Sequence, residues 1–149
     1  MQESTIAIIE GVQTVSDPVE LAWAFPEVNA GQVPFGGRVI IQLRRVRKTA
    51  KGSRIILVDE TKENEKWQNM IGKVIAVGPL AFKNRDTMAS WPEGSWAEIG
   101  DFVRVPKWGG DRWERTIAGD DSPVLFMTIN DHELISRVTD DPLSFNVFI

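Results

Sequence analysis

The chain has 149 residues, 42% of them hydrophobic, and a net charge of −4. This length favours one domain, and the apolar content is enough for a sizeable core, so a wholly disordered chain is not expected. The negative charge argues against general affinity for nucleic acid or for an anionic membrane. Because the chain has no cysteine, disulfide frameworks and thiolate metal sites are excluded.

Membrane and secretion signals are also missing from the sequence. No stretch approaches the roughly 20 apolar residues that cross a bilayer. The first residues, Met1 to Thr5, lack the basic start of a secretory signal. We therefore expect a cytoplasmic protein.

Residues 1–33 form a mixed leader, which Pro18, Pro26 and nearby Pro34 break into pieces. Residues 5–9 predict a short strand, and residues 19–25 fit either a helical turn or a strand. We expect this leader to be an appendage with apolar contact points and not a second domain.

From Arg38 onward, short β-branched segments alternate with turn residues. Gly78-Pro79 and Asn130-Asp131 are examples of the turns. No helical period and no internal repeat is visible, so the pattern predicts an all-β fold, a small barrel or sandwich. The predicted strands cover residues 38–44, 72–77, 102–105, 113–117, 124–129 and 134–138.

The longest polar stretch lies at residues 46–70. Structureless loops of this length are uncommon inside compact domains, and they are usually functional or disordered. Both of its charged flanks have little to bury, yet Ile55-Ile56-Leu57 lies between them. From the pattern alone, the tripeptide fits a short buried strand as well as an apolar segment that waits for a partner's groove.

The order and spacing of the segments resemble those of the GroES-type co-chaperonins, over residues 34–138. Each fragment alone is common in proteins, so the resemblance depends on the order and spacing of the fragments together. The fragments are Pro34 to Ile41, the loop with its apolar tripeptide, Gly72 to Pro79, Gly100 to Val103, Lys107 to Gly110, and Leu125 to Asp131.

This resemblance implies a GroES-like irregular β-barrel with a mobile loop at about 46–70 and a roof hairpin at about 79–99, followed by a C-terminal tail at 139–149. In that family, seven subunits form a ring that caps the chamber of a GroEL-type chaperonin, where unfolded protein substrates fold. Each mobile loop docks through its apolar tripeptide. Carried over, the chaperonin-binding residues are Ile55, Ile56 and Leu57, and the residues that give the loop flexibility are Lys51 and Gly52.

No cofactor is expected, because ATP would be bound and hydrolysed by the partner chaperonin. The chain itself has no glycine-rich phosphate loop that ends in Gly-Lys-Ser/Thr.

Ring assembly predicts pairing between exposed strands of neighbouring subunits. We expect residues 33–40 of one subunit to pair with residues 134–138 of the next. The predicted interface residues are Val39, Ile40, Leu134, Ile135 and Val138.

Three departures from the family pattern stand out. The family often has two glycines directly before the tripeptide, whereas here Ser53 and Arg54 separate Gly52 from Ile55. The leader (1–33) and the tail (139–149) have no counterpart in the family pattern, and the segment 79–99 is longer than usual for the family. Such divergence suits a virus-encoded or specialised co-chaperonin, which in the viral case would act in the host cytoplasm.

Two alternatives remain open at this point, a single-stranded nucleic-acid-binding β-barrel and a ring-forming structural protein. Six tryptophans could stack on bases. The overall acidity weighs against the nucleic-acid alternative, and the leader and tail permit the structural one. The nucleic-acid alternative is supported by a basic run without an intervening acid: Arg44, Arg45, Arg47, Lys48, Lys51 and Arg54.

An enzyme is not expected. The single histidine, His132, lies in a turn sequence, and one imidazole makes neither a catalytic triad nor a convincing metal site. Asp120-Asp121 and Asp140-Asp141 are interpreted as turn residues, and no dinucleotide fingerprint is present. We therefore predict no catalytic residue and no metal ligand.

Overall fold

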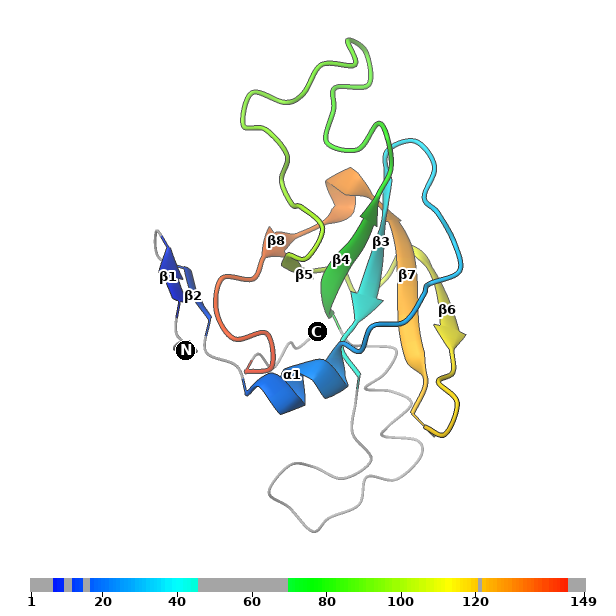
Figure 1. Cartoon of the computed structure of the whole chain (residues 1–149). Helices are drawn as coiled ribbons and strands as arrows, with labels where there is room; N and C mark the ends of the chain where they lie inside the picture. Colours follow the sequence, from blue (N-terminus) through cyan, green and yellow to red (C-terminus); the bar gives the residue numbers. More distant parts are fainter. Residues whose placement is uncertain (1–6, 10–11, 15–16, 46–69, 121, 145–149) are drawn as a thin grey trace.

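The computed structural model describes residues 7–9, 12–14, 17–45, 70–120 and 122–144 (Figure 1). Its main feature is an antiparallel sheet of six strands in the order β6-β7-β3-β4-β5-β8. The all-β prediction is confirmed, although within the described residues the outer strands β6 and β8 do not pair to close the sheet. The strands are β3 (Arg38–Leu43), β4 (Ile71–Val77), β5 (Phe102–Arg104), β6 (Asp111–Arg115), β7 (Val124–Asn130) and β8 (Ser136–Arg137).

The leader contributes a separate two-stranded hairpin, β1 (Ala7–Ile9) with β2 (Val12–Thr14), and one helix, α1 (Pro18–Ala24). The helix interpretation of the ambiguous segment is therefore the right one. Asp17 caps α1, because its Oδ1 accepts a hydrogen bond from the backbone N–H of Val19 at 2.9 Å. Pro18 occupies the first turn, where its missing N–H costs nothing.

Strand β3 lies at the centre of the fold, paired with β4 on one side and β7 on the other. Residues 39–43 are all buried, because both faces of the strand are covered. Val39 and Ile41 belong to the main core, while Ile40 packs with Phe126 on the opposite face. The near-continuous apolar run of β3 is thus a consequence of two covered faces.

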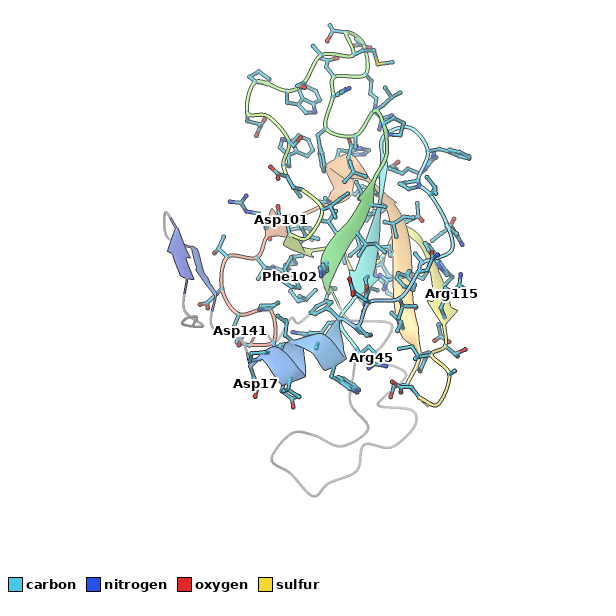
Figure 2. All side chains as sticks on the ribbon, viewed as in Figure 1. Asp17, Arg45, Asp101, Phe102, Arg115 and Asp141 are labelled. Carbon is cyan, nitrogen blue, oxygen red and sulfur yellow. The ribbon has the colours of Figure 1, made fainter. Side chains whose placement is uncertain are left out.

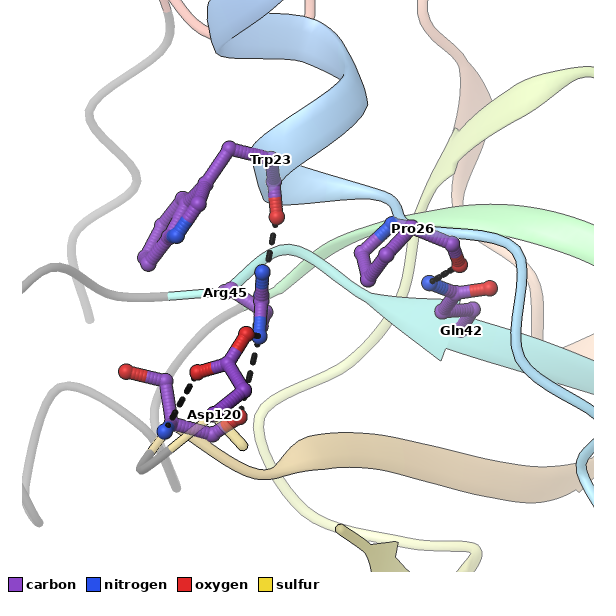
Figure 3. Close-up of polar contacts among 6 residues, drawn as sticks. Trp23, Pro26, Gln42, Arg45 and Asp120 are labelled. Atoms are coloured by element: carbon purple, nitrogen blue, oxygen red, sulfur yellow. Dashed lines mark hydrogen bonds and ion pairs between the residues drawn. The ribbon is translucent and has the colours of Figure 1, made fainter. Parts of the chain in front are cut away.

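Residues 25–30 of the leader supply the cover on that opposite face. Ala30 packs in the cluster of Ile40 and Phe126, and its carbonyl accepts a hydrogen bond from Trp113 Nε1 at 2.9 Å. Gln42 Nε2 donates to the carbonyl of Pro26 at 2.8 Å (Figure 3). The leader therefore packs on the sheet from α1 onward.

The connections of β4 leave from opposite ends of the strand. Leu43 pairs with Gly72 at one end of the β3–β4 pair, and Val39 pairs with Val77 at the other. The segment 46–69 joins the strands at the Leu43–Gly72 end. Residues 78–101 leave at the Val77 end and project beyond the sheet, as the green segment in Figure 1 shows.

No helix among the described residues is long and apolar enough to cross a membrane.

Candidate docking-loop base, roof and sheet edges

The predicted mobile loop begins and ends at one place in the fold. The backbone N–H of Arg44 donates to the carbonyl of Ile71 at 3.0 Å, so the two roots of the loop are bonded to each other. The structure describes the chain up to Arg45 and again from Met70. The predicted docking residues Ile55, Ile56 and Leu57, with Lys51 and Gly52, lie outside the described residues.

Arg45 at the first root lies beside the end of α1 (Figure 2) and is held by two separate parts of the chain, the end of α1 and the β6–β7 connection (Figure 3). Its backbone N–H donates to the carbonyl of Ala24 at 3.1 Å, and its Nε donates to the carbonyl of Trp23 at 2.8 Å. Its Nη1 lies 2.9 Å from Asp120 Oδ2 and 2.9 Å from the carbonyl of Ser122. The Arg45 side chain is only 3% exposed.

This arginine also completes helix α1. The helix carries Glu20 in its first turn but no basic residue in its last turn. The Arg45 guanidinium bonds the Trp23 carbonyl and its backbone N–H bonds the Ala24 carbonyl, so both acceptors at the helix end have partners and the positive charge complements the negative end of the dipole. The guanidinium carbon of Arg45 further lies 4.4 Å from the ring centroid of Trp23.

Asp120 responds to these surroundings. The backbone N–H of Ser122 and the side chain of Arg45 both donate to its carboxylate, and together they lower the pKa of Asp120 below its ordinary value. The turn interpretation of Asp120 holds, but the residue also forms an ion pair to the loop root.

A second buried acid, Asp131, fastens the roof segment at the other end of the sheet. Asp131 is 3% exposed, and its Oδ2 accepts from the backbone N–H of Phe82 at 2.7 Å. Its Oδ1 accepts from the N–H of His132 at 2.8 Å and lies 3.4 Å from Arg85 Nη2. Phe82 is held at a positive φ of 61°, which a non-glycine residue rarely adopts, so this bond fixes a sharp turn.

The roof segment itself is irregular. An isolated bridge joins Lys83 to Ser90, and Trp91 stacks on Trp96 with 6.1 Å between ring centroids. Trp96 also packs edge-on against Phe82. The predicted roof is therefore an aromatic-braced loop rather than a regular hairpin.

The predicted subunit interface needs a correction at Val39 and Ile40. Both residues are fully buried, and β3 already pairs with β4 and β7. Their side chains and their strand edges are therefore not available to a neighbouring subunit. The apolar pattern of residues 38–44 could not show this central position, because a strand with two covered faces has the same pattern at the centre of a sheet as at its edge.

The other predicted interface residues lie at a sheet edge. Strand β8 pairs with β5 on one side and is an outer strand of the sheet. Ile135 is 52% exposed, whereas Leu134 packs against the main core and Val138 against the cluster of α1. Only Ile135 of these three presents a large apolar surface to solvent.

A pocket of about 300 Å³ opens beside β8, between this strand and the base of the roof. We call it the edge pocket. Its apolar wall includes Trp96, Val103, Leu134 and Ile135, and Arg137 and Glu93 also line it.

The described residues of the nucleic-acid alternative have partners inside the fold, whereas four members of the basic run lie outside the described residues: Arg47, Lys48, Lys51 and Arg54. Arg45 is buried, and Arg44 Nη1 donates to the carbonyl of Pro142 at 2.8 Å. Trp113 stacks on Phe126 within the core face. Among the described tryptophans, Trp108 alone is mostly exposed, at 77%, and a single tryptophan does not form a stacking platform.

His132 is exposed as expected, with 64% of its side chain accessible, and it lies in the short 3-10 helix η1 (Asp131–Glu133) that follows β7. Within the described residues, no group of three or more histidine, cysteine, aspartate or glutamate side chains could hold a metal ion.

No protein-family model matches the sequence, and no curated protein matches it.

Proposed function

We propose that this protein is a co-chaperonin of the GroES type, a cytoplasmic ring of GroES-like barrel subunits that caps a GroEL-type chaperonin through Ile55, Ile56 and Leu57. The observation that carries the proposal is the opposite placement of two long connections on one strand pair. The segment 46–69 is rooted at the Leu43–Gly72 end, and residues 78–101 leave from the Val39–Val77 end. A cap needs this arrangement, because one end must reach the chaperonin while the other closes the chamber.

The rigid roots support the same proposal. The two loop roots are bonded to each other, and Arg45 at the first root is also bonded to the end of helix α1. Ordering of a docking segment on its partner is then confined to the residues between the roots, since the roots themselves are already fixed. Each residue left unfixed would add about 1–2 kcal/mol of backbone entropy to the cost of docking.

The energetics favour a ring of such subunits. Burying three aliphatic side chains gains roughly 1.5–3 kcal/mol each, and ordering a handful of loop residues cancels most of this gain. A single loop therefore binds weakly, but several loops on one ring bind as a unit, because each later contact is intramolecular. Release requires only a small weakening of every contact when the chaperonin hydrolyses ATP.

Substitution of Ile56 by Asp tests the proposal. We expect the variant to keep its thermal unfolding midpoint and its native mass, and to lose support of chaperonin-dependent refolding of a denatured substrate. Ile99→Asp is the matched control, because Ile99 is 67% exposed in a turn of the body and should tolerate the charge. If Ile56→Asp instead unfolds the protein, the tripeptide is part of the core and the proposal fails.

A further inference from the structure

A second pocket, of about 410 Å³, lies between β4 and residues 25–29 of the leader, and we call it the leader pocket. Phe25 and Val28 line it from the leader, and Ile75 lines it from β4. Ile99 also lines it and is 67% exposed. The pocket therefore leaves apolar surface in contact with water that a further apolar segment would cover.

The leader pocket separates two apolar clusters of the fold. Phe25 belongs to the cluster of α1. Val28 and Ile75 pack instead against the cluster that contains Phe126. An apolar occupant would join the two clusters into one continuous layer, and this would remove additional apolar surface from water.

The charges of the leader pocket favour an uncharged occupant. Among the described residues that line it, Glu27 and Lys73 carry charges of opposite sign, so the lining has no net charge. The two uncharged polar residues of the lining, Asn29 and Gln42, already form hydrogen bonds with backbone groups of the leader. A charged ligand would gain no compensating net charge here, whereas an apolar segment loses nothing by leaving water.

The chain itself contains an uncharged apolar segment at residues 145–149, which lie outside the described residues. Four of these five residues are large and apolar, and the fifth is Asn146. The apolar residues are Phe145, Val147, Phe148 and Ile149.

The described end of the tail is held close to the leader pocket. The carbonyl of Pro142 accepts a hydrogen bond from Arg44 Nη1 at 2.8 Å, and Leu143 packs against the cluster of α1, to which Phe25 belongs. Figure 1 shows the red segment after β8 running to α1. Five extended residues span up to about 17 Å. The segment 145–149 starts beside the cluster of Phe25 and can therefore reach the pocket that Phe25 lines.

We propose that residues 145–149 occupy the leader pocket of the same chain, with the aromatic side chains of Phe145 and Phe148 between Phe25 and Ile75. The tail then lies as a strap over the leader. The two segments without a counterpart in the family pattern thus hold each other on the sheet. This inference goes beyond the proposed function and does not depend on it, because the contact involves neither a chaperonin nor a second copy.

Disulfide trapping tests the contact on the full chain, which has no cysteine of its own. Ile99→Cys is combined in turn with Phe145→Cys, Val147→Cys and Phe148→Cys, and each double variant is oxidised. A disulfide forms only where the two Cα atoms approach within about 7 Å. We expect at least one of the three pairs to give a disulfide-linked peptide in a species that keeps the mass of one chain under denaturing conditions.

Val33→Cys replaces Ile99→Cys in the matched control. Val33 is 80% exposed and precedes Gly36, whose carbonyl bonds Leu80 in the roof segment, so this cysteine lies away from the leader pocket. We expect no disulfide with it. The inference is wrong if none of the Ile99→Cys pairs forms a disulfide, if the disulfides join two chains, or if the control pairs form them in equal yield.

Thermal unfolding gives a second test without cysteines. The double variant Phe145→Ser with Phe148→Ser should lower the unfolding midpoint by about 4–8 °C, because the pocket loses its apolar cover. Asn146→Ser in the same segment is the control and should leave the midpoint unchanged. An unchanged midpoint in the double variant would also overturn the inference. Trapping of the disulfide in a protein that binds no chaperonin would leave the inference standing and remove the proposed function.

Discussion

Arg45 Nη1 lies 2.9 Å from Asp120 Oδ2, and this ion pair joins the first root of the 46–69 segment to the turn before β7. The same guanidinium bonds the last turn of α1 through Trp23. One side chain therefore links the leader, the central strand and the β6–β7 connection.

Replacement of Arg45 by Met should destabilise the fold by about 2–3 kcal/mol. The variant loses the charged hydrogen bonds to Trp23, Asp120 and Ser122, and it leaves the carbonyl groups without their donor. Urea unfolding at neutral pH measures the change. Arg38→Met, at the exposed start of β3, should change the unfolding free energy by less than about 0.5 kcal/mol. Equal losses in the two variants would contradict the assigned role.

The Asp120 carboxylate should contribute to stability in a pH-dependent way. Its pKa is lower in the folded protein than in the unfolded chain. Its contribution is therefore present above the unfolded pKa, at about 4, and is lost as the pH falls through the lower folded pKa. Asp120→Asn should flatten the loss of stability below about pH 4 in urea titrations. If the unfolding free energy of Asp120→Asn falls with decreasing pH as steeply as that of the unaltered protein, the ion pair does not contribute.

Asp131 should matter far more than its ion-pair partner. Asp131→Asn can place an amide N–H against the N–H of Phe82, and it should cost about 1–3 kcal/mol because both groups are buried. Arg85→Ala should cost less than about 1 kcal/mol, since the Arg85 side chain is 57% exposed and lies 3.4 Å away. Amide exchange at Phe82 should accelerate only in the Asp131 variant. The reverse order of effects would show that the ion pair, and not the backbone bond, holds the roof.

Substitutions at Ile40 and Ile135 distinguish a residue of the core from a residue of a subunit interface. Because Ile40 is fully buried against Phe126, Ile40→Ala should lower the unfolding free energy by about 3 kcal/mol even in a monomer. Ile135→Ala should cost about 1 kcal/mol or less in a monomer and should weaken assembly instead. The comparison requires unfolding curves measured on the monomeric protein. An Ile40→Ala monomer as stable as the unaltered monomer would contradict the core role of Ile40.

Much of the fold follows from the sequence pattern. β-branched runs bounded by Gly-Pro and Asn-Asp turns placed β3, β4 and β7 within a residue or so, because alternation and turn chemistry are local properties. The strand predicted at 113–117 instead spans Asp111–Arg115, and the one predicted at 134–138 shortens to Ser136–Arg137. Both lie at sheet edges, where pairing with one neighbour decides the bounds.

The buried charges were not predictable in the same way. Arg45 lies in a run of basic residues that is typical of a solvated loop base, and Asp131 lies in a turn sequence. Each is buried by segments distant in the chain: Trp23 and Asp120 around Arg45, and Phe82 above Asp131. No local pattern reports such contacts, since they arise only when the leader and the roof fold onto the sheet.

Hydrogen exchange at residues 55–57 tests the central claim most directly, measured on the free protein and on its complex with a GroEL-type chaperonin and nucleotide. We predict rapid exchange of these amides in the free protein and strong slowing in the complex, while the amides of β3 are slow in both. Protection of Leu57 and its neighbours already in the free protein would contradict the account, because the tripeptide would then belong to the protein's own core.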